Sequence, residues 1–240
     1  MNWELIYIIA TIAILPLMIY GFIAHSNVNS TFNKYAKIPA KSQITAAELA
    51  KQLLTKAGIN DVDVELIRGT LTDCYDPRHK VIKLSESTYY STSVSAIGVC
   101  AHEVGHAIQH HRKNILFMIR GWVVPVVNLI SRMCLPLILL GSILSFAFLI
   151  PTVGYYIVIA SLVSYGASLL FCIITLPLEI DASKQALEIM RQTGEFSDYE
   201  IRAAKDVLHA AAQTYIASFL MSLAYFLRFL SYAMIFSKDR

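Results

Sequence analysis

Charged side chains are scarce in this sequence. Only 15% of its 240 residues are Asp, Glu, Lys or Arg, against about 25% in an average soluble protein, while 56% are hydrophobic. The mean hydropathy is +0.54. A soluble fold would leave too much of this apolar surface exposed to water. The composition therefore predicts a membrane protein that lies in a lipid bilayer.

Basic clusters and paired cysteines are also missing. Twenty Lys and Arg stand against seventeen Asp and Glu, and no Lys/Arg-rich run of the kind that binds nucleic acid is present. The four cysteines form no CxxC pair, and Cys134 and Cys172 fall in apolar segments. This argues against a disulfide framework and a cysteine zinc site, and it favours a reducing compartment. No nucleic-acid partner is expected.

The N-terminus lacks the features of a cleavable signal peptide. Glu4 is the only charged side chain before the first apolar run, residues 5–23, and no A-x-A site follows that run. The run is long enough to cross a hydrocarbon core of about 30 Å. A retained transmembrane anchor is therefore predicted.

After this anchor the composition becomes mixed and polar. Thr45 and Glu48 have the spacing of a capping box at the start of a helix. Residues 62–67 and 80–84 alternate like two short strands, and a helix with one apolar face is expected at 93–111. This region is predicted to be a zincin-like unit with a short strand pair.

The remaining sequence alternates apolar and polar segments. An apolar stretch broken by Pro125 and Asn128 is expected to lie along the bilayer surface, and two later runs joined by a loop at 151–154 are expected to form a transmembrane hairpin. Arg228 interrupts the last apolar run.

The predicted segments are an anchor (1–23), a polar catalytic region (24–118), an interfacial segment (119–132), the hairpin (133–176), a polar helical region (177–212) and a last transmembrane helix (213–240). The predicted fold class is a mainly α membrane protein with about four transmembrane helices.

Basic residues flank the predicted spans on one side of the membrane. They are Lys34, Lys37, Lys41, Arg112, Lys113, Arg120 and Arg132, whereas the hairpin loop has none. The positive-inside rule then places the polar segments in the cytoplasm, although Lys238 and Arg240 fall on the opposite side. The predicted location is the plasma (inner) membrane, as a multi-pass protein with a cytoplasmic active site.

The main chemical signal is the sequence HEVGH at residues 102–106. On a helix, His102 and His106 lie on the same face, one turn apart, so that both imidazoles can reach a single ion. Zn²⁺ accepts two neutral imidazoles and one further protein ligand and leaves a fourth position for a water, whose pKa falls to about 7. Glu103 is placed to take a proton from that water and to deliver it to the leaving amine. The motif predicts a zinc peptidase with a protein or peptide substrate.

The third ligand distinguishes the subclasses of zinc peptidase. A metzincin would have glycine and histidine where this chain has Gln109 and Arg112, so that pattern fails. An intramembrane protease would bury the motif in a long apolar span, which the polar residues 110–113 make the weaker of the topologies that stay open. A carboxylate from a later helix remains. Glu179 is the best candidate, because the predicted hairpin returns it to the side of the metal helix. Asp181 is a candidate for fixing the tautomer of a ligand histidine.

Further residues are candidates for binding and stabilising the substrate. An extended peptide is expected to pair with the edge of a strand beside the metal helix. The candidate edge strand consists of Lys80, Val81, Ile82, Lys83 and Leu84. His209 and Tyr215 are the candidate donors to the developing oxyanion. His79, His110 and His111 lack the spacing of ligands and are expected to be solvated.

Four short runs together resemble one known family. They are TDCYDP at 72–77, LS at 84–85, AHEVGHAIQ at 101–109 and LEIDAS at 178–183. Over nearly the whole chain the sequence closely resembles the YugP-type family of membrane neutral zinc metallopeptidases. The layout of spans is more distantly similar to that of HtpX-type heat-shock proteases and CAAX prenyl proteases, in which an aspartate stands four positions after the glutamate ligand rather than two, as Asp181 does here. The resemblance implies zinc-dependent peptide hydrolysis.

Two functions other than proteolysis fit a membrane protein with a zinc helix. One is a non-catalytic adaptor that keeps zinc as structure, and the other is a chaperone-like scaffold that works with a partner protein. The presence of Glu103 argues against the adaptor, because a structural site would close its fourth position with a protein ligand. Long partner-binding insertions, which would favour the scaffold, are not evident. A homo-oligomer or a partner protein is compatible with the sequence.

Overall fold

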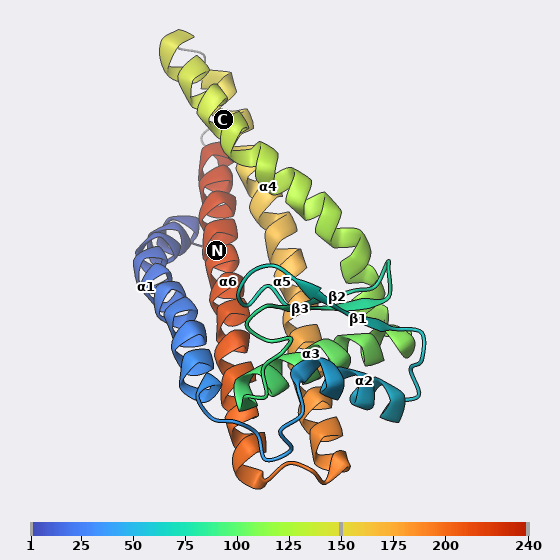
Figure 1. The fold of residues 1–240 in the computed structure, drawn as a ribbon. Helices are drawn as coiled ribbons and strands as arrows, with labels where there is room; N and C mark the ends of the chain where they lie inside the picture. The colour runs from blue at the N-terminus through green and yellow to red at the C-terminus, as the bar shows by residue number, and fades with distance from the viewer. Residues whose placement is uncertain (1, 149–150, 239–240) are drawn as a thin grey trace. The chain divides into compact units, whose positions relative to one another are not determined.

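The computed structural model describes residues 2–148 and 151–238 and is mainly helical (Figure 1). Its elements are α1 (Trp3–Ala36), α2 (Ala46–Lys56), β1 (Asp63–Ile67), β2 (Cys74–Asp76), β3 (Val81–Ser85), α3 (Val94–His111), α4 (Ile115–Phe148), α5 (Pro151–Thr193) and α6 (Asp198–Lys238). The mainly α fold expected from the sequence is confirmed.

The chain divides into two compact units. The membrane unit consists of Met1–Ile23, Ile119–Leu176 and Tyr215–Arg240, and the polar unit consists of Ala24–Met118 and Pro177–Thr214. The helices α1, α4, α5 and α6 each contribute residues to both units. The HEVGH motif and all three strands belong to the polar unit.

Three helical segments are long and apolar enough to cross a bilayer among the residues described. They are Trp3–Ala36, Tyr156–Thr193 and Asp198–Ile235, and a shorter apolar helical segment covers Ile115–Val127. Large apolar side chains such as Phe22, 84% exposed, and Ile12, 68% exposed, are accounted for if lipid surrounds these helices. The chain is therefore a membrane protein. Most side chains of the predicted span 133–150, together with residues 149–150, lie outside the described part of the chain.

Helix boundaries differ from the prediction at one connection. Residues 151–154, predicted to be the loop of the hairpin, form the first turn of α5. Proline suits the first position of a helix because its fixed φ is helical and its missing N–H has no partner there in any case. Pro125 does not end α4, which continues from Ile115 to Phe148.

Polar and aromatic contacts join the helices within the membrane unit. The Tyr165 ring stacks on those of Tyr225 and Phe229, with centroids 4.7 and 5.4 Å apart. The Arg228 guanidinium, which interrupts the last apolar run, lies 5.9 Å from the centroid of the Tyr7 ring. A cation over an aromatic face is stabilised by the ring quadrupole, which offsets part of the cost of placing it in an apolar helix.

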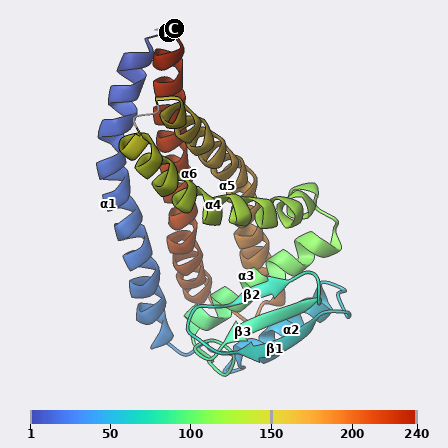
Figure 2. The ribbon, with the colours of Figure 1, turned by 90° about the horizontal axis from the view of Figure 1, so that it is seen from above.

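The polar unit contains a three-stranded sheet in the order β1-β3-β2 (Figure 2). The central strand β3 pairs in parallel with β1, as in Val64 opposite Ile82, and antiparallel with β2, as in Tyr75 opposite Ile82. The predicted strand pair is therefore extended by β2, whose three residues are too few to show an alternating pattern among the surrounding turn residues. The prediction that residues 80–84 form an edge strand is wrong, because β3 is paired on both sides.

Helix caps and buried leucines hold α2 and α3 against this sheet. The capping box of α2 is confirmed: the Thr45 hydroxyl accepts from the Glu48 N–H, and the Glu48 carboxylate accepts from the Thr45 N–H. Ser93 caps α3 by accepting from the Ala96 N–H. Fully buried side chains form the core between these elements; they include Leu49, Leu53, Ile82, Leu84, Ile97 and Val104.

Candidate metal centre

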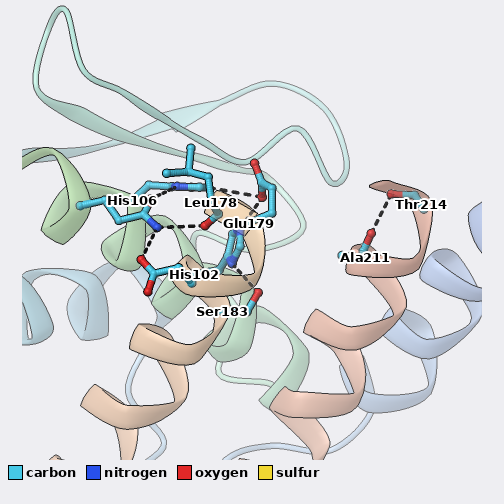
Figure 3. Close-up of polar contacts among 9 residues, drawn as sticks. His102, His106, Leu178, Glu179, Ser183, Ala211 and Thr214 are labelled. Atoms are coloured by element: carbon cyan, nitrogen blue, oxygen red, sulfur yellow. Dashed lines mark hydrogen bonds and ion pairs between the residues drawn. The ribbon is translucent and has the colours of Figure 1, made fainter. Parts of the chain in front are cut away.

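Three potential metal ligands converge in the polar unit (Figure 3). His102 and His106 project from α3 one turn apart, and Glu179 projects from α5. Oε2 of Glu179 lies 3.2 Å from Nε2 of His102 and 3.5 Å from Nε2 of His106. The structure thus brings together the three residues that the sequence singles out as ligands.

The donor set and its spacing fit zinc. Two imidazole nitrogens and a carboxylate oxygen are common ligands of Zn²⁺, and bond lengths of about 2.0 to 2.1 Å in a tetrahedron place neighbouring donor atoms about 3.3 Å apart. The separations of 3.2 and 3.5 Å are close to that value. Glu179 and His106 are buried, whereas the His102 side chain keeps 15% exposure.

A close helix crossing brings Glu179 to the histidines. A Cβ atom at Gly105 would lie only 2.5 Å from the Ala182 carbonyl oxygen, a distance that Cβ atoms essentially never show. Only glycine therefore lets α3 and α5 approach this closely. Gly105, the second variable position of the HExxH motif, is therefore required by the close packing of α3 against α5.

Glu103 lies beside the ligands and is almost completely buried, with 7% exposure. The pKa of its carboxyl group is raised to about 7, chiefly because the group is buried; Glu179 and Asp73 also raise the pKa, whereas His102 lowers it. The backbone N–H of Tyr75 in β2 donates to the Glu103 carboxylate. A carboxyl group with a pKa near neutrality can both accept and release a proton at physiological pH.

The position of β2 depends on Asp73, the second residue of the TDCYDP run. Its carboxylate accepts from the Ser85 N–H at 2.8 Å, from the Ser85 hydroxyl at 2.9 Å and from the Thr88 hydroxyl at 3.2 Å. These bonds tie the start of β2 to the end of β3. Two of the runs that carry the family resemblance, at 72–77 and 84–85, are therefore in contact.

Each ligand histidine has a polar partner on its second ring nitrogen. His102 Nδ1 lies 3.2 Å from the Ser183 hydroxyl, and His106 Nδ1 lies 3.0 Å from Oε1 of Gln109. Asp181, the residue predicted to fix the tautomer of a ligand histidine, accepts from Gln109 Nε2 at 2.7 Å, so its link to His106 runs through the Gln109 side chain. Sequence reasoning missed Gln109 and Ser183 as partners, although Gln109 follows His106 by three positions, a spacing that places both on one helix face.

His110, Tyr75 and Phe117 form an aromatic cluster beside the candidate metal centre. The expectation that His110 is solvated is therefore wrong. His110 is half-buried, its Nδ1 lies 2.8 Å from the Tyr75 hydroxyl, and its ring stacks on Phe117 at 5.5 Å. Burial lowers the pKa of His110, which favours the neutral ring, and raises the pKa of Tyr75 to about 12. The Phe117 centroid is also 6.1 Å from that of His106. His79 and His111 are exposed, as expected.

The other predicted site residues remain predictions or need correction. Residues 80–84 cannot offer a free edge to a substrate, because β3 is central; among the described strands, β1 and β2 are the edges. His209 is exposed on α6 in the polar unit, and Tyr215 belongs to the membrane unit. Their role as oxyanion donors stays a prediction.

Comparison of the sequence with known proteins identifies its family. Residues 10–234 match the family described as "putative neutral zinc metallopeptidase". The chain is 41% identical over 236 residues to the "putative membrane protease YugP" of Bacillus subtilis (strain 168), and the match covers 98% of this chain and 99% of that protein. No solved structure matches. The chain belongs to the family of putative neutral zinc metallopeptidases.

Proposed function

We propose that this protein is a membrane endopeptidase that hydrolyses peptide bonds with zinc held by His102, His106 and Glu179. The observation that carries the proposal is the convergence of two imidazole nitrogens and one carboxylate oxygen within 4.8 Å of one another. The buried carboxyl group of Glu103 lies on the same helix, directly after the first ligand. This combination provides a metal site together with a proton acceptor.

Glu103 is the proposed general base and acid. When bound, zinc would polarise the scissile carbonyl and lower the pKa of a bound water. Glu103 accepts the proton of the attacking water and then donates it to the leaving amine, so that one residue serves both halves of the reaction. The Tyr75 N–H orients the carboxylate for this transfer, and burial removes water that would compete for the proton.

The edge of β2 is the proposed binding surface for the substrate backbone. An extended peptide adds to a free strand edge through main-chain hydrogen bonds. β2 pairs with β3 on one side only, and its residue Tyr75 contacts Glu103. A substrate strand paired with β2 would therefore lie next to the proposed base, which residues 80–84 cannot achieve from the centre of the sheet.

The substrate is proposed to be a protein or peptide that reaches the enzyme from the cytoplasm. The membrane location rests on the apolar helices and on similarity to a membrane protease. The cytoplasmic side and the plasma membrane rest on the basic residues that flank the spans, which include Lys34, Lys37 and Arg120.

A structural zinc site in an adaptor or scaffold is the alternative function. Structural sites have four protein ligands, whereas the metal group found among the described residues consists of three. A group of three ligands beside a buried glutamate is the arrangement expected of a catalytic site, and it favours catalysis.

The substitution Glu103→Gln tests the proposal. Glutamine keeps the size of the side chain but cannot accept the proton, so hydrolysis of a mixed peptide library by the purified protein should fall roughly a hundred- to ten-thousand-fold. Zinc content should stay near that of the wild type, because Glu103 is not a ligand. Glu188→Gln, on the exposed face of α5, is the control and should keep full activity. Equal hydrolysis by wild type and Glu103→Gln would exclude this mechanism.

A further inference from the structure

We propose that Gln109 is a positioning residue that fixes the tautomer of His106, so that Nε2 of this ring faces the metal with a free lone pair. The proposal rests on the zinc site described above and assigns a role to a residue outside the ligand set. Gln109 is fully buried, with 0% exposure, so its amide group forms its hydrogen bonds with protein atoms rather than with bulk water.

The orientation of the Gln109 amide follows from its partners. Its Nε2 lies 2.9 Å from the Leu178 carbonyl oxygen and 2.7 Å from Asp181 Oδ2. A backbone carbonyl can only accept, and an ionised carboxylate likewise only accepts, so both positions require an N–H donor. The two amide hydrogens are thereby used, and Oε1 must point the other way, toward His106.

The orientation of the amide determines which nitrogen of His106 carries the proton. Oε1 of Gln109 has no hydrogen, so His106 Nδ1–H must be the donor across the 3.0 Å contact. A neutral imidazole has one N–H, and His106 Nε2 is therefore left as an acceptor or metal ligand. This nitrogen is the one that lies 3.5 Å from Glu179 Oε2.

Asp181 is the fixed end of this chain of hydrogen bonds. Its Oδ2 accepts from Gln185 Nε2 at 2.6 Å as well as from Gln109, which holds the carboxylate in place. The aspartate therefore acts on His106 through the amide and not by direct contact. His102 differs, because its partner Ser183 has a hydroxyl group that can either donate or accept and so does not impose a tautomer.

Zinc affinity separates this role from a merely structural one. Competition of the full-length protein with a chromogenic chelator should show that Gln109→Leu binds zinc roughly ten- to a hundredfold more weakly than the wild type, the usual effect of losing an outer partner of a ligand. Gln185→Leu is the matched control: it also removes a hydrogen bond to Asp181, but the contact from Gln109 to His106 remains. Its zinc affinity should stay within about threefold of the wild type.

A substitution of the same size gives a second test. In Gln109→Glu the new carboxylate would face the Asp181 carboxylate across 2.7 Å and the Leu178 carbonyl oxygen across 2.9 Å, two acceptors that need an N–H donor. Zinc affinity should therefore fall at least as far as in Gln109→Leu. Because glutamate keeps the size of the side chain, a general loss of packing would not explain this result.

Zinc affinity of Gln109→Leu equal to that of the wild type would overturn the proposal. Absence of zinc binding by the wild type would instead refute the proposed function.

Discussion

Glu179 is separated from His106 by 73 residues in the sequence, and yet its Oε2 lies within 3.5 Å of the His106 ring. If it is a metal ligand, Glu179→Ala should lower zinc affinity by more than the roughly hundredfold that loss of an outer partner can cause. Glu188→Ala removes an exposed carboxylate from the same helix and should leave affinity unchanged. Zinc titration of both variants compares the two effects. Equal affinities would mean that another residue is the third ligand.

Gly105 provides a second test at the residue scale, because it controls how closely two helices approach. In Gly105→Ala the new methyl group would overlap the Ala182 carbonyl oxygen, and the resulting shift would move Glu179, three residues away on α5. We expect weaker zinc binding and a loss of about 1 to 3 kcal/mol of stability from overpacking. Thermal unfolding and zinc titration measure the two effects.

Gly98→Ala is the control for that substitution. Its methyl group would meet Ala204 of α6 at 3.2 Å, a tight contact with a different helix from the one that carries Glu179. It should retain the zinc affinity of the wild type whatever its effect on stability. A Gly105→Ala variant with normal zinc affinity would show that the helix crossing does not position Glu179.

Residue chemistry explains which site residues could be found from the sequence. His102, Glu103 and His106 have a spacing that only a helix can use, and Glu179 is a carboxylate at the end of a predicted span. Gln109 and Ser183 are neutral side chains with no pattern of their own, and their partners become visible only when α3 and α5 are packed. The sequence around His110 predicts a solvated side chain, because Tyr75 and Phe117, which cover it, come from other elements.

At the scale of elements, the order of the strands in the sheet could not be predicted from the sequence. Alternation predicted β1 and β3 correctly, because each is five residues long. It could not reveal that β3 lies between two neighbours, since pairing depends on contacts between distant segments. The three residues of β2 follow TDCYDP, in which turn-forming residues dominate the pattern.

Asp73→Ala should loosen β2 without removing a metal ligand. Three hydrogen bonds to Ser85 and Thr88 would be lost, so the strand beside Glu103 would no longer be held in one position. We expect kcat/KM for a cleaved library peptide to fall about tenfold or more, while zinc affinity remains near the wild-type value. Asp61→Ala breaks an exposed ion pair with Lys80 and should change little. Unchanged kcat/KM in Asp73→Ala would argue against β2 as the substrate edge.

At the scale of the whole molecule, composition alone was enough to predict a membrane protein, because its excess of apolar side chains needs lipid contact. Three of the predicted spans coincide with long apolar helices among the described residues. Helix ends are harder to predict from the sequence. Pro151 suggests a loop, yet proline is equally compatible with the first turn of a helix, and it begins α5. The side of the membrane on which the polar unit lies remains a prediction from basic residues.

Cys74 makes that prediction testable with the protein's own thiols. It is exposed in the polar unit, whereas Cys100 and Cys172 are buried. If the polar unit is cytoplasmic, a membrane-impermeant maleimide should label Cys74 in inside-out vesicles and not in intact spheroplasts, because only the former expose the cytoplasmic face. The experiment uses a Cys134→Ser background, in which Cys74→Ser should abolish the labelling and so identify its site. Labelling of Cys74 in intact spheroplasts would place the metal centre on the outer side, and the substrate would then have to be an extracytoplasmic protein.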